Sequence, residues 1–79
     1  MKVLYFAQAA SLTGCREEEW TTQGIRSLDD FWAEAIRRHP GLSGLRAQCR
    51  VASGRQYVGH GEALTENEEV AVIPPVSGG

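Results

Sequence analysis

The sequence contains few of the residues that build disulfide, metal or catalytic sites. Its two cysteines, Cys15 and Cys49, are too widely separated for a disulfide framework, and they form no C-x-x-C pair. We therefore expect free thiols in a reducing compartment, each packed as a small hydrophobic residue. The two histidines, His39 and His60, have no second ligand at a metal-binding spacing, which favours surface positions for both. These absences argue against a zinc ribbon or a thioredoxin-type site.

Long hydrophobic runs and a one-sided charge are lacking as well. The apolar stretch at residues 3–7 is too short for a signal peptide, and no stretch approaches membrane-spanning length. The net charge is −2 and the 8 basic residues are scattered, which argues against nucleic acid as the main partner. Gly54, Gly59 and Gly61 are followed by no G-K-[ST], so no phosphate-binding loop is predicted. The composition indicates one small cytoplasmic domain without a visible enzyme site.

The clearest periodic pattern is a helix that begins after Ser27. Five apolar residues recur at helical spacing and form one stripe: Leu28, Phe31, Trp32, Ala35 and Ile36. Ser27 is a suitable N-cap, and Asp30 three residues later makes a variant of the capping box. Pro40 and Gly41 are expected to end the helix. We interpret the Phe31-Trp32 pair as part of the core.

Stretches of β-forming residues lie on either side of this helix. Residues 2–7 and 69–73 are apolar on both alternating faces, which is typical of strands at the centre of a sheet. Residues 16–22 carry three glutamates and predict an exposed edge strand with a solvated face. Residues 45–52 and 56–59 are expected to pair as a hairpin. Short connections are expected at residues 9–14, 53–54 and 64–68, the first with one helical turn that Gly14 ends.

The order of these elements predicts an α+β fold. A single helix buries its stripe most economically across one face of a mixed sheet of four to five strands. The first and last strands, apolar on both faces, belong side by side in the middle of that sheet. This arrangement is the β-grasp, or ubiquitin-like, fold. We expect the domain to span residues 1–75 and a flexible Gly-Gly tail to occupy residues 76–79.

The tail indicates covalent chemistry at the C-terminus. Pro74 and Pro75 favour an extended course that projects the following residues away from the domain. Gly78 and Gly79 have no side chains, so this end can enter a narrow channel in another protein with its carboxylate unhindered. A carboxylate becomes electrophilic once a separate enzyme adenylates it with ATP, and a sulfur donor can then convert it into a thiocarboxylate. This chain would itself bind no cofactor.

The chain resembles the small subunit of molybdopterin synthase, the sulfur carrier of molybdenum cofactor biosynthesis. Three segments carry the resemblance: Val3-Leu4-Tyr5-Phe6-Ala7, the helix after Ser27, and residues 69–79 with their Pro-Pro-Val-Ser-Gly-Gly ending. The resemblance implies that an E1-like enzyme adenylates Gly79 and that a sulfurtransferase or desulfurase then supplies sulfur. It further implies that the thiocarboxylate enters the large synthase subunit, within a heterotetramer, and builds the molybdopterin dithiolene on a cyclic pyranopterin.

The same resemblance assigns roles to individual residues. Gly79 is the residue acted upon, and the chain is then a non-catalytic subunit of a sulfurtransferase. Residues expected to bind the partners are Phe6, Tyr57, Ile73, Pro74, Pro75, Val76, Ser77 and Gly78. Tyr57 and Ile73 match family residues on an apolar patch shared by the activating enzyme and the large subunit, and Phe6 matches more weakly. The chain departs from the family in two turns, at Ser53-Gly54 and at Asn67 in place of glycine.

Other functions use the same tail and remain open from the residues alone. A sulfur carrier for thiamine, cysteine or tRNA thiolation would share the chemistry and differ in the acceptor. A ubiquitin-like protein modifier would instead join Gly79 to a lysine through an isopeptide bond. A β-grasp interaction module with an inert tail would perform neither reaction. The chemical state of Gly79 in cells distinguishes these classes.

Overall fold

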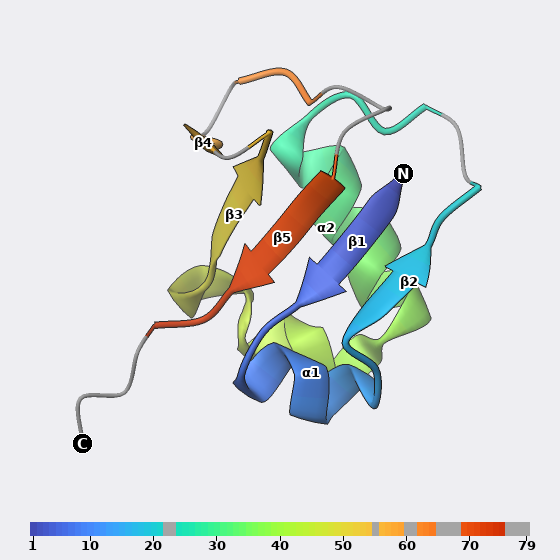
Figure 1. The fold of residues 1–79 in the computed structure, drawn as a ribbon, viewed down its shortest axis with the longest axis vertical. Helices are drawn as coiled ribbons and strands as arrows, with labels where there is room; N and C mark the ends of the chain where they lie inside the picture. Colours follow the sequence, from blue (N-terminus) through green and yellow to red (C-terminus); the bar gives the residue numbers. More distant parts are fainter. Residues whose placement is uncertain (22–23, 55, 60–61, 65–68, 76–79) are drawn as a thin grey trace.

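The computed structural model describes residues 1–21, 24–54, 56–59, 62–64 and 69–75. They form one mixed sheet of five strands with the main helix lying across one of its faces (Figure 1). This is the α+β arrangement that the sequence predicts. The predicted tail at residues 76–79, the turn at residues 65–68 and His60 lie outside the described residues.

The strands follow the order β2-β1-β5-β3-β4 across the sheet. The elements are β1 (Lys2–Tyr5), α1 (Gln8–Thr13), β2 (Glu17–Glu19), α2 (Leu28–Arg38), η1 (Pro40–Gly44), η2 (Arg46–Gln48), β3 (Arg50–Ser53), β4 (Gln56–Tyr57) and β5 (Glu69–Ile73). Both η elements are 3₁₀ helices. Among the residues that the structure describes, no helix is long and apolar enough to cross a membrane.

The two central strands, β1 and β5, run parallel to each other. Val3 pairs with Val70 and Tyr5 pairs with Val72. These four side chains are buried in the core together with Phe31, Trp32 and Ala35 of α2. The two-sided apolar pattern therefore predicted the central positions of residues 2–7 and 69–73 correctly, and β5 has the predicted bounds.

Helix α2 begins at the predicted cap. The Ser27 hydroxyl accepts a hydrogen bond from the Asp30 N–H at 3.1 Å, which satisfies one donor of the first turn. The Asp30 carboxylate accepts from the Arg26 N–H at 3.2 Å, one residue earlier than in an ordinary capping box. Gly14 ends α1 in the left-handed conformation with φ 76°, as its position in the sequence predicts.

The edge strand β2 is shorter than predicted and is not solvated on both faces. Trp20 and Met1 exchange backbone hydrogen bonds at 2.8 and 2.9 Å, which extends the β1–β2 ladder by one pair. Because strand side chains alternate, Trp20 and Glu18 point to the same side, toward the core. Trp20 is 1% exposed and its ring stacks on Phe31 at 5.1 Å. The expectation of a fully solvated glutamate run is therefore wrong for Glu18.

The strand predicted at residues 45–52 begins only at Arg50. Its first part forms η2, which follows directly on η1; Pro40 starts η1 as a 3₁₀ helix, in which residues three apart share a face. Leu42 and Leu45 have this spacing and both are buried. The hairpin itself is confirmed, since Ala52 pairs with Tyr57 across the β3–β4 turn.

The ion pairs of Glu34 on α2 predict an acid-sensitive contribution to stability. Arg37 and Arg38 each reach Glu34 Oε2 at 2.6 Å. Hydrogen bonding from Arg37, with a smaller contribution from Arg38, lowers the pKa of Glu34 from 4.5 to about 2. Since the folded state binds the proton less tightly, this stabilisation is complete above pH 4.5 and is lost as the pH falls toward 2.

We therefore expect Glu34→Gln to lower the free energy of unfolding at pH 7 by about 0.5 kcal/mol, as for other helical ion pairs. The difference from the wild-type chain should shrink as the pH falls from 5 to 2. Urea unfolding at a series of pH values measures both effects. Glu62→Gln is the control, because Glu62 makes no ion pair among the described residues. A gap between wild type and Glu34→Gln that stays constant with pH contradicts this account.

Candidate functional site

The predicted site at the C-terminus follows directly from the central strand of the sheet. Ile73 is the last residue of β5, Pro74 is buried and Pro75 is exposed. Val76 to Gly79 lie outside the described residues. The structure therefore places only the residues that lead into the tail, Ile73, Pro74 and Pro75, which form the approach to it. Since β5 is paired with β1 on one side and with β3 on the other, this approach starts from a strand held on both edges (Figure 1).

The sheet face opposite α2 carries an apolar surface beside this approach. The pairing register places these residues on that face: Leu4, Ala52, Tyr57, Ala71 and Ile73. Ala71 is paired with Leu4 on one side and with Ala52 on the other. The Phe6 N–H donates to the Val72 carbonyl at 3.2 Å, which continues the parallel register and sets Phe6 beside Ile73. We call these six residues the open-face patch.

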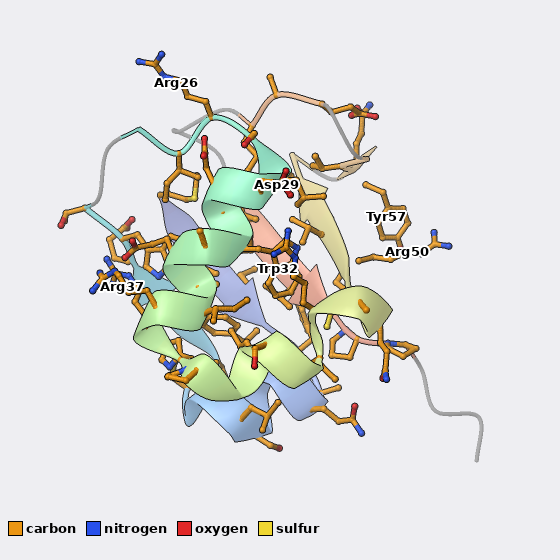
Figure 2. All side chains as sticks on the ribbon, turned by 180° about the vertical axis from the view of Figure 1, so that it is seen from behind. Arg26, Asp29, Trp32, Arg37, Arg50 and Tyr57 are labelled. Carbon is orange, nitrogen blue, oxygen red and sulfur yellow. The ribbon has the colours of Figure 1, made fainter. Side chains whose placement is uncertain are left out.

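The open-face patch has exposed aromatic residues and charged borders. Tyr57 is 59% exposed and Phe6 is 48% exposed. The Arg50 guanidinium lies over the Tyr57 ring at 5.2 Å, a cation–π contact on the β3–β4 side of the patch (Figure 2). At the other end of the strands, Lys2 forms ion pairs with Glu17 at 3.1 Å and with Glu69 at 3.8 Å. The apolar part of the face therefore lies near the end of β5.

The structure brings together the predicted partner-binding residues that it describes. Phe6 and Ile73 lie on neighbouring strands, and Tyr57 lies on the same face two strands from β5. Their role in binding a partner stays a prediction. Sequence reasoning missed Leu4, Ala52, Ala71 and Arg50, although the period of two in each strand could have assigned them to this face once the sheet order was known.

A surface groove lies beside the patch, between the end of β1, helix α1 and the start of β2. Ala7 lines the groove and has φ 50° and ψ −125°, a conformation that residues with a side chain rarely adopt. Its carbonyl accepts from the Ala10 N–H at 3.0 Å and from the Ser11 N–H at 3.3 Å. The chain thus turns sharply at Ala7, which allows Phe6 to stay on the sheet while α1 folds back.

A second group of polar side chains lies under the sheet edge, around Glu18. One carboxylate oxygen, Oε1, accepts from the Tyr5 hydroxyl at 2.5 Å and from Trp20 Nε1 at 2.8 Å. His39 Nε2 lies 2.9 Å from the same oxygen. Burial alone would raise the pKa of Glu18, but these hydrogen bonds outweigh it and lower the pKa. Burial, together with the bond to Glu18, raises the pKa of Tyr5 and keeps its hydroxyl protonated.

This cluster corrects the sequence-based expectation for His39. The His39 side chain is only 18% exposed, so it is not a surface histidine. It lies at the C-cap of α2, and its ring meets the Tyr5 ring edge-on at 5.6 Å. Cys15 and Cys49 are free, half-buried and packed against the core, as expected, and burial raises the pKa of Cys49. These contacts join residues far apart in the sequence, so no local spacing could have revealed them.

The fold and the C-terminal approach match one family of known proteins. The ThiS family model matches residues 3–79. The chain belongs to the ThiS family. Within it, the human molybdopterin synthase sulfur carrier subunit is 43% identical to this chain, with 100% of this chain and 93% of the human protein covered. The resemblance found from the sequence is therefore confirmed.

Solved structures of ThiS-like proteins support the same fold. A protein of Pyrococcus furiosus assigned as molybdopterin converting factor subunit 1 has a TM-score of 0.80 at 30% identity, with 95% of both chains covered. SAMP1 from Haloferax volcanii has a TM-score of 0.82 at 27% identity and covers 99% of this chain and 97% of its own. The predicted ubiquitin-like β-grasp fold is confirmed.

The conformation of Ala7 gives a direct test of the turn that positions Phe6. Strain in such a conformation destabilises the folded state by on the order of 1–3 kcal/mol, and glycine would relieve it. Glycine also loses more conformational entropy on folding than alanine, which offsets about 0.5–1 kcal/mol of that gain. We expect Ala7→Gly to raise the free energy of unfolding by about 1 kcal/mol in urea titrations. The control is Ala33→Gly, in the exposed interior of α2, which should lower it by about 1 kcal/mol. Equal losses in both variants would show that Ala7 is unstrained.

Proposed function

We propose that this chain is the sulfur carrier subunit of a molybdopterin synthase and that Gly79 carries the sulfur as a thiocarboxylate. The observation that carries the proposal is the 43% identity to the human sulfur carrier subunit along the whole chain. The position of the tail supports it, because residues 74–79 follow directly from a central strand beside an apolar, exposed surface. In this role the chain is a substrate and a donor, and its partners supply the catalytic groups.

The chemistry proceeds in three steps at the carboxyl end. In the activating enzyme, the Gly79 carboxylate attacks the α-phosphorus of ATP and releases pyrophosphate. The persulfide of a sulfur donor then displaces AMP from the acyl-adenylate, so that a C–S bond replaces the activated C–O bond, and a thiol cleaves the resulting acyl disulfide to leave the thiocarboxylate and a disulfide. In the large subunit, the thiocarboxylate sulfur attacks a carbon of the cyclic pyranopterin and displaces an oxygen from it, and water then hydrolyses the resulting thioester, which leaves the sulfur on the pterin and returns Gly79 to the carboxylate. Two such donations supply both sulfurs of the dithiolene.

The open-face patch is the surface that we propose both partners bind in turn. Exposed aromatic and aliphatic residues surrounded by charged ones are typical of protein interfaces, where aromatic residues contribute much of the binding energy. Arg50 lies beside Tyr57 and can meet a carboxylate on the partner. Because the patch adjoins the end of β5, a partner that binds it would also receive the tail. Successive partners using one surface must then exclude each other.

A protein modifier is the second candidate, supported by the similarity to the SAMP1 structure. In that case the activated Gly79 would acylate a lysine of another protein. The chain itself offers one lysine, Lys2, which is half-exposed and paired with Glu17 and Glu69. A hydrogen bond and the charge of Glu17 raise the pKa of Lys2 above its ordinary value.

The state of Gly79 tests the proposed function. We expect intact-mass spectrometry of the chain, purified from cells that contain the activating enzyme, to show one oxygen replaced by one sulfur at Gly79. Deletion of Gly79 should abolish the sulfur-bearing species and molybdopterin formation while leaving the fold unchanged. High-mass conjugates in place of the thiocarboxylate would favour the modifier, and cofactor synthesis by the deletion variant would refute sulfur carriage.

The role of the patch predicts a selective loss of partner binding. We expect Tyr57→Ser and Phe6→Ser each to weaken binding to the large subunit at least tenfold in calorimetric titrations, because each removes a large exposed apolar group from the proposed interface. Leu12→Ser is the matched control, since Leu12 is 49% exposed but lies on α1, away from the sheet face. Equal affinities for all three variants and the wild-type chain would place the interface elsewhere.

A further inference from the structure

We propose that Cys15, Glu18 and His39 form a binding site for one zinc-like divalent cation. The three residues come from three separate places: the loop after α1, the strand β2 and the C-cap of α2. Each offers one ligand atom, and these atoms all lie within 4.8 Å of one another. The site is distinct from the open-face patch and from the tail, and its existence does not depend on sulfur carriage.

The set of donors fits zinc better than the other common divalent cations. Zinc binds thiolate sulfur at about 2.3 Å and imidazole nitrogen or carboxylate oxygen at about 2.0–2.1 Å, which places neighbouring ligand atoms roughly 3.5 Å apart. The Cys15 sulfur therefore needs to approach the other two ligand atoms by about 1 Å at most, whereas Glu18 Oε1 and His39 Nε2, 2.9 Å apart, need to separate slightly. A thiolate together with a carboxylate also neutralises the charge of a divalent ion. Magnesium and calcium prefer oxygen ligands throughout, so Cys15 disfavours them.

The groups behind the three ligands hold them in place. Tyr5 and Trp20 both donate to Glu18 Oε1, so they fix the carboxylate from the side of the core. The Tyr5 ring also meets the His39 ring at an interplanar angle of 80°, which limits rotation of the imidazole. Outer hydrogen bonds and packing of this kind orient the ligands at zinc sites. An entering ion would replace only the contact between His39 Nε2 and Glu18 Oε1.

The Cys15 side is held by Thr13 and is open to solvent. The Cys15 N–H donates to Thr13 Oγ1 at 3.4 Å, and its Sγ lies 3.7 Å from the same oxygen. Cys15 also lines the surface groove beside α1, which gives an ion a route of entry and leaves room for a water molecule as fourth ligand. Glu18 and His39 are 23% and 18% exposed, so the site is shielded without being closed.

The nearest basic residues are accounted for within the fold. Arg38 adjoins His39 in the sequence, and its Nε pairs with Glu34 at 2.6 Å while its guanidinium lies over the Trp20 ring. Its charge is thus already compensated by a carboxylate outside the site. Arg16 is exposed. Cys15 is the third ligand that makes a metal site out of the contact between Glu18 and His39.

Cobalt titration of the reduced, metal-free, full-length chain tests the site. We expect one equivalent of Co²⁺ to produce the near-ultraviolet band of a thiolate–cobalt bond and the visible bands of a tetrahedral ion. One equivalent of Zn²⁺ should remove both sets of bands and raise the midpoint of thermal unfolding. The absence of a thiolate band at saturating Co²⁺ would overturn the proposal.

Three conservative variants make the test specific. Cys15→Ser and His39→Gln should each weaken Co²⁺ binding at least tenfold, and Cys15→Ser should also lose the thiolate band. Cys49→Ser is the matched control, because Cys49 is a second half-buried thiol and should be dispensable. A band lost in Cys49→Ser, retained in Cys15→Ser, or arising only from two chains per ion would refute the site. Urea unfolding of the metal-free variants confirms that each one folds.

Discussion

The parallel pairing of β1 with β5 is the contact on which the rest of the structure depends. It joins segments from opposite ends of the described chain, and it places Val3, Tyr5, Val70 and Val72 against α2 in the core. The loop-closure entropy of such a long-range contact must be offset by buried apolar area, which these strands supply through residues on their inner face. β2 is then added beside β1 and β3 beside β5, and β4 pairs with β3.

The same pairing gives the two faces of the sheet different roles. The inner face packs on α2 and stabilises the domain, while the outer face stays apolar without a helix of the described chain lying across it. Apolar residues on a solvated face contribute little to folding, so their presence calls for an explanation at the level of binding. The β-grasp fold of the ThiS family thus provides stability and recognition from the alternating residues of the same strands.

Sequence analysis correctly predicted features that depend on local or alternating patterns. Its predictions were wrong where contacts between distant residues determine the local structure. Ser27 and Gly14 predicted their caps because capping involves residues within one turn. Residues 45–52 alternate well enough to suggest a strand, yet Leu42 and Leu45 share the face of a 3₁₀ helix that Pro40 begins. Tertiary packing of two leucines outweighed the alternation there.

The Glu18 cluster shows the same limit at the level of a site. Glu18, Trp20 and His39 are ordinary residues in their own segments, and the contacts among them arise only when β2 is placed at the edge near the end of α2. More of the candidate interface could be predicted, because the family resemblance assigned Phe6, Tyr57 and Ile73 to it and the apolar pattern had placed residues 2–7 and 69–73 side by side. Sequence reasoning thus located the surface near the tail but not the polar cluster beneath the sheet.

The pairing of β5 on both edges also limits how far Gly79 can lie from the domain. Pro74 is buried against the domain, so the chain is held in place up to the start of the tail. Four residues separate Pro75 from the end of Gly79, and a fully extended chain covers at most about 3.3–3.6 Å per residue, or roughly 14 Å in total. Any enzyme that acts on Gly79 while gripping the sheet must therefore keep its reacting atoms within that radius of Pro75. If two partners bind the sheet in turn, this reach sets the greatest depth at which either one can hold Gly79.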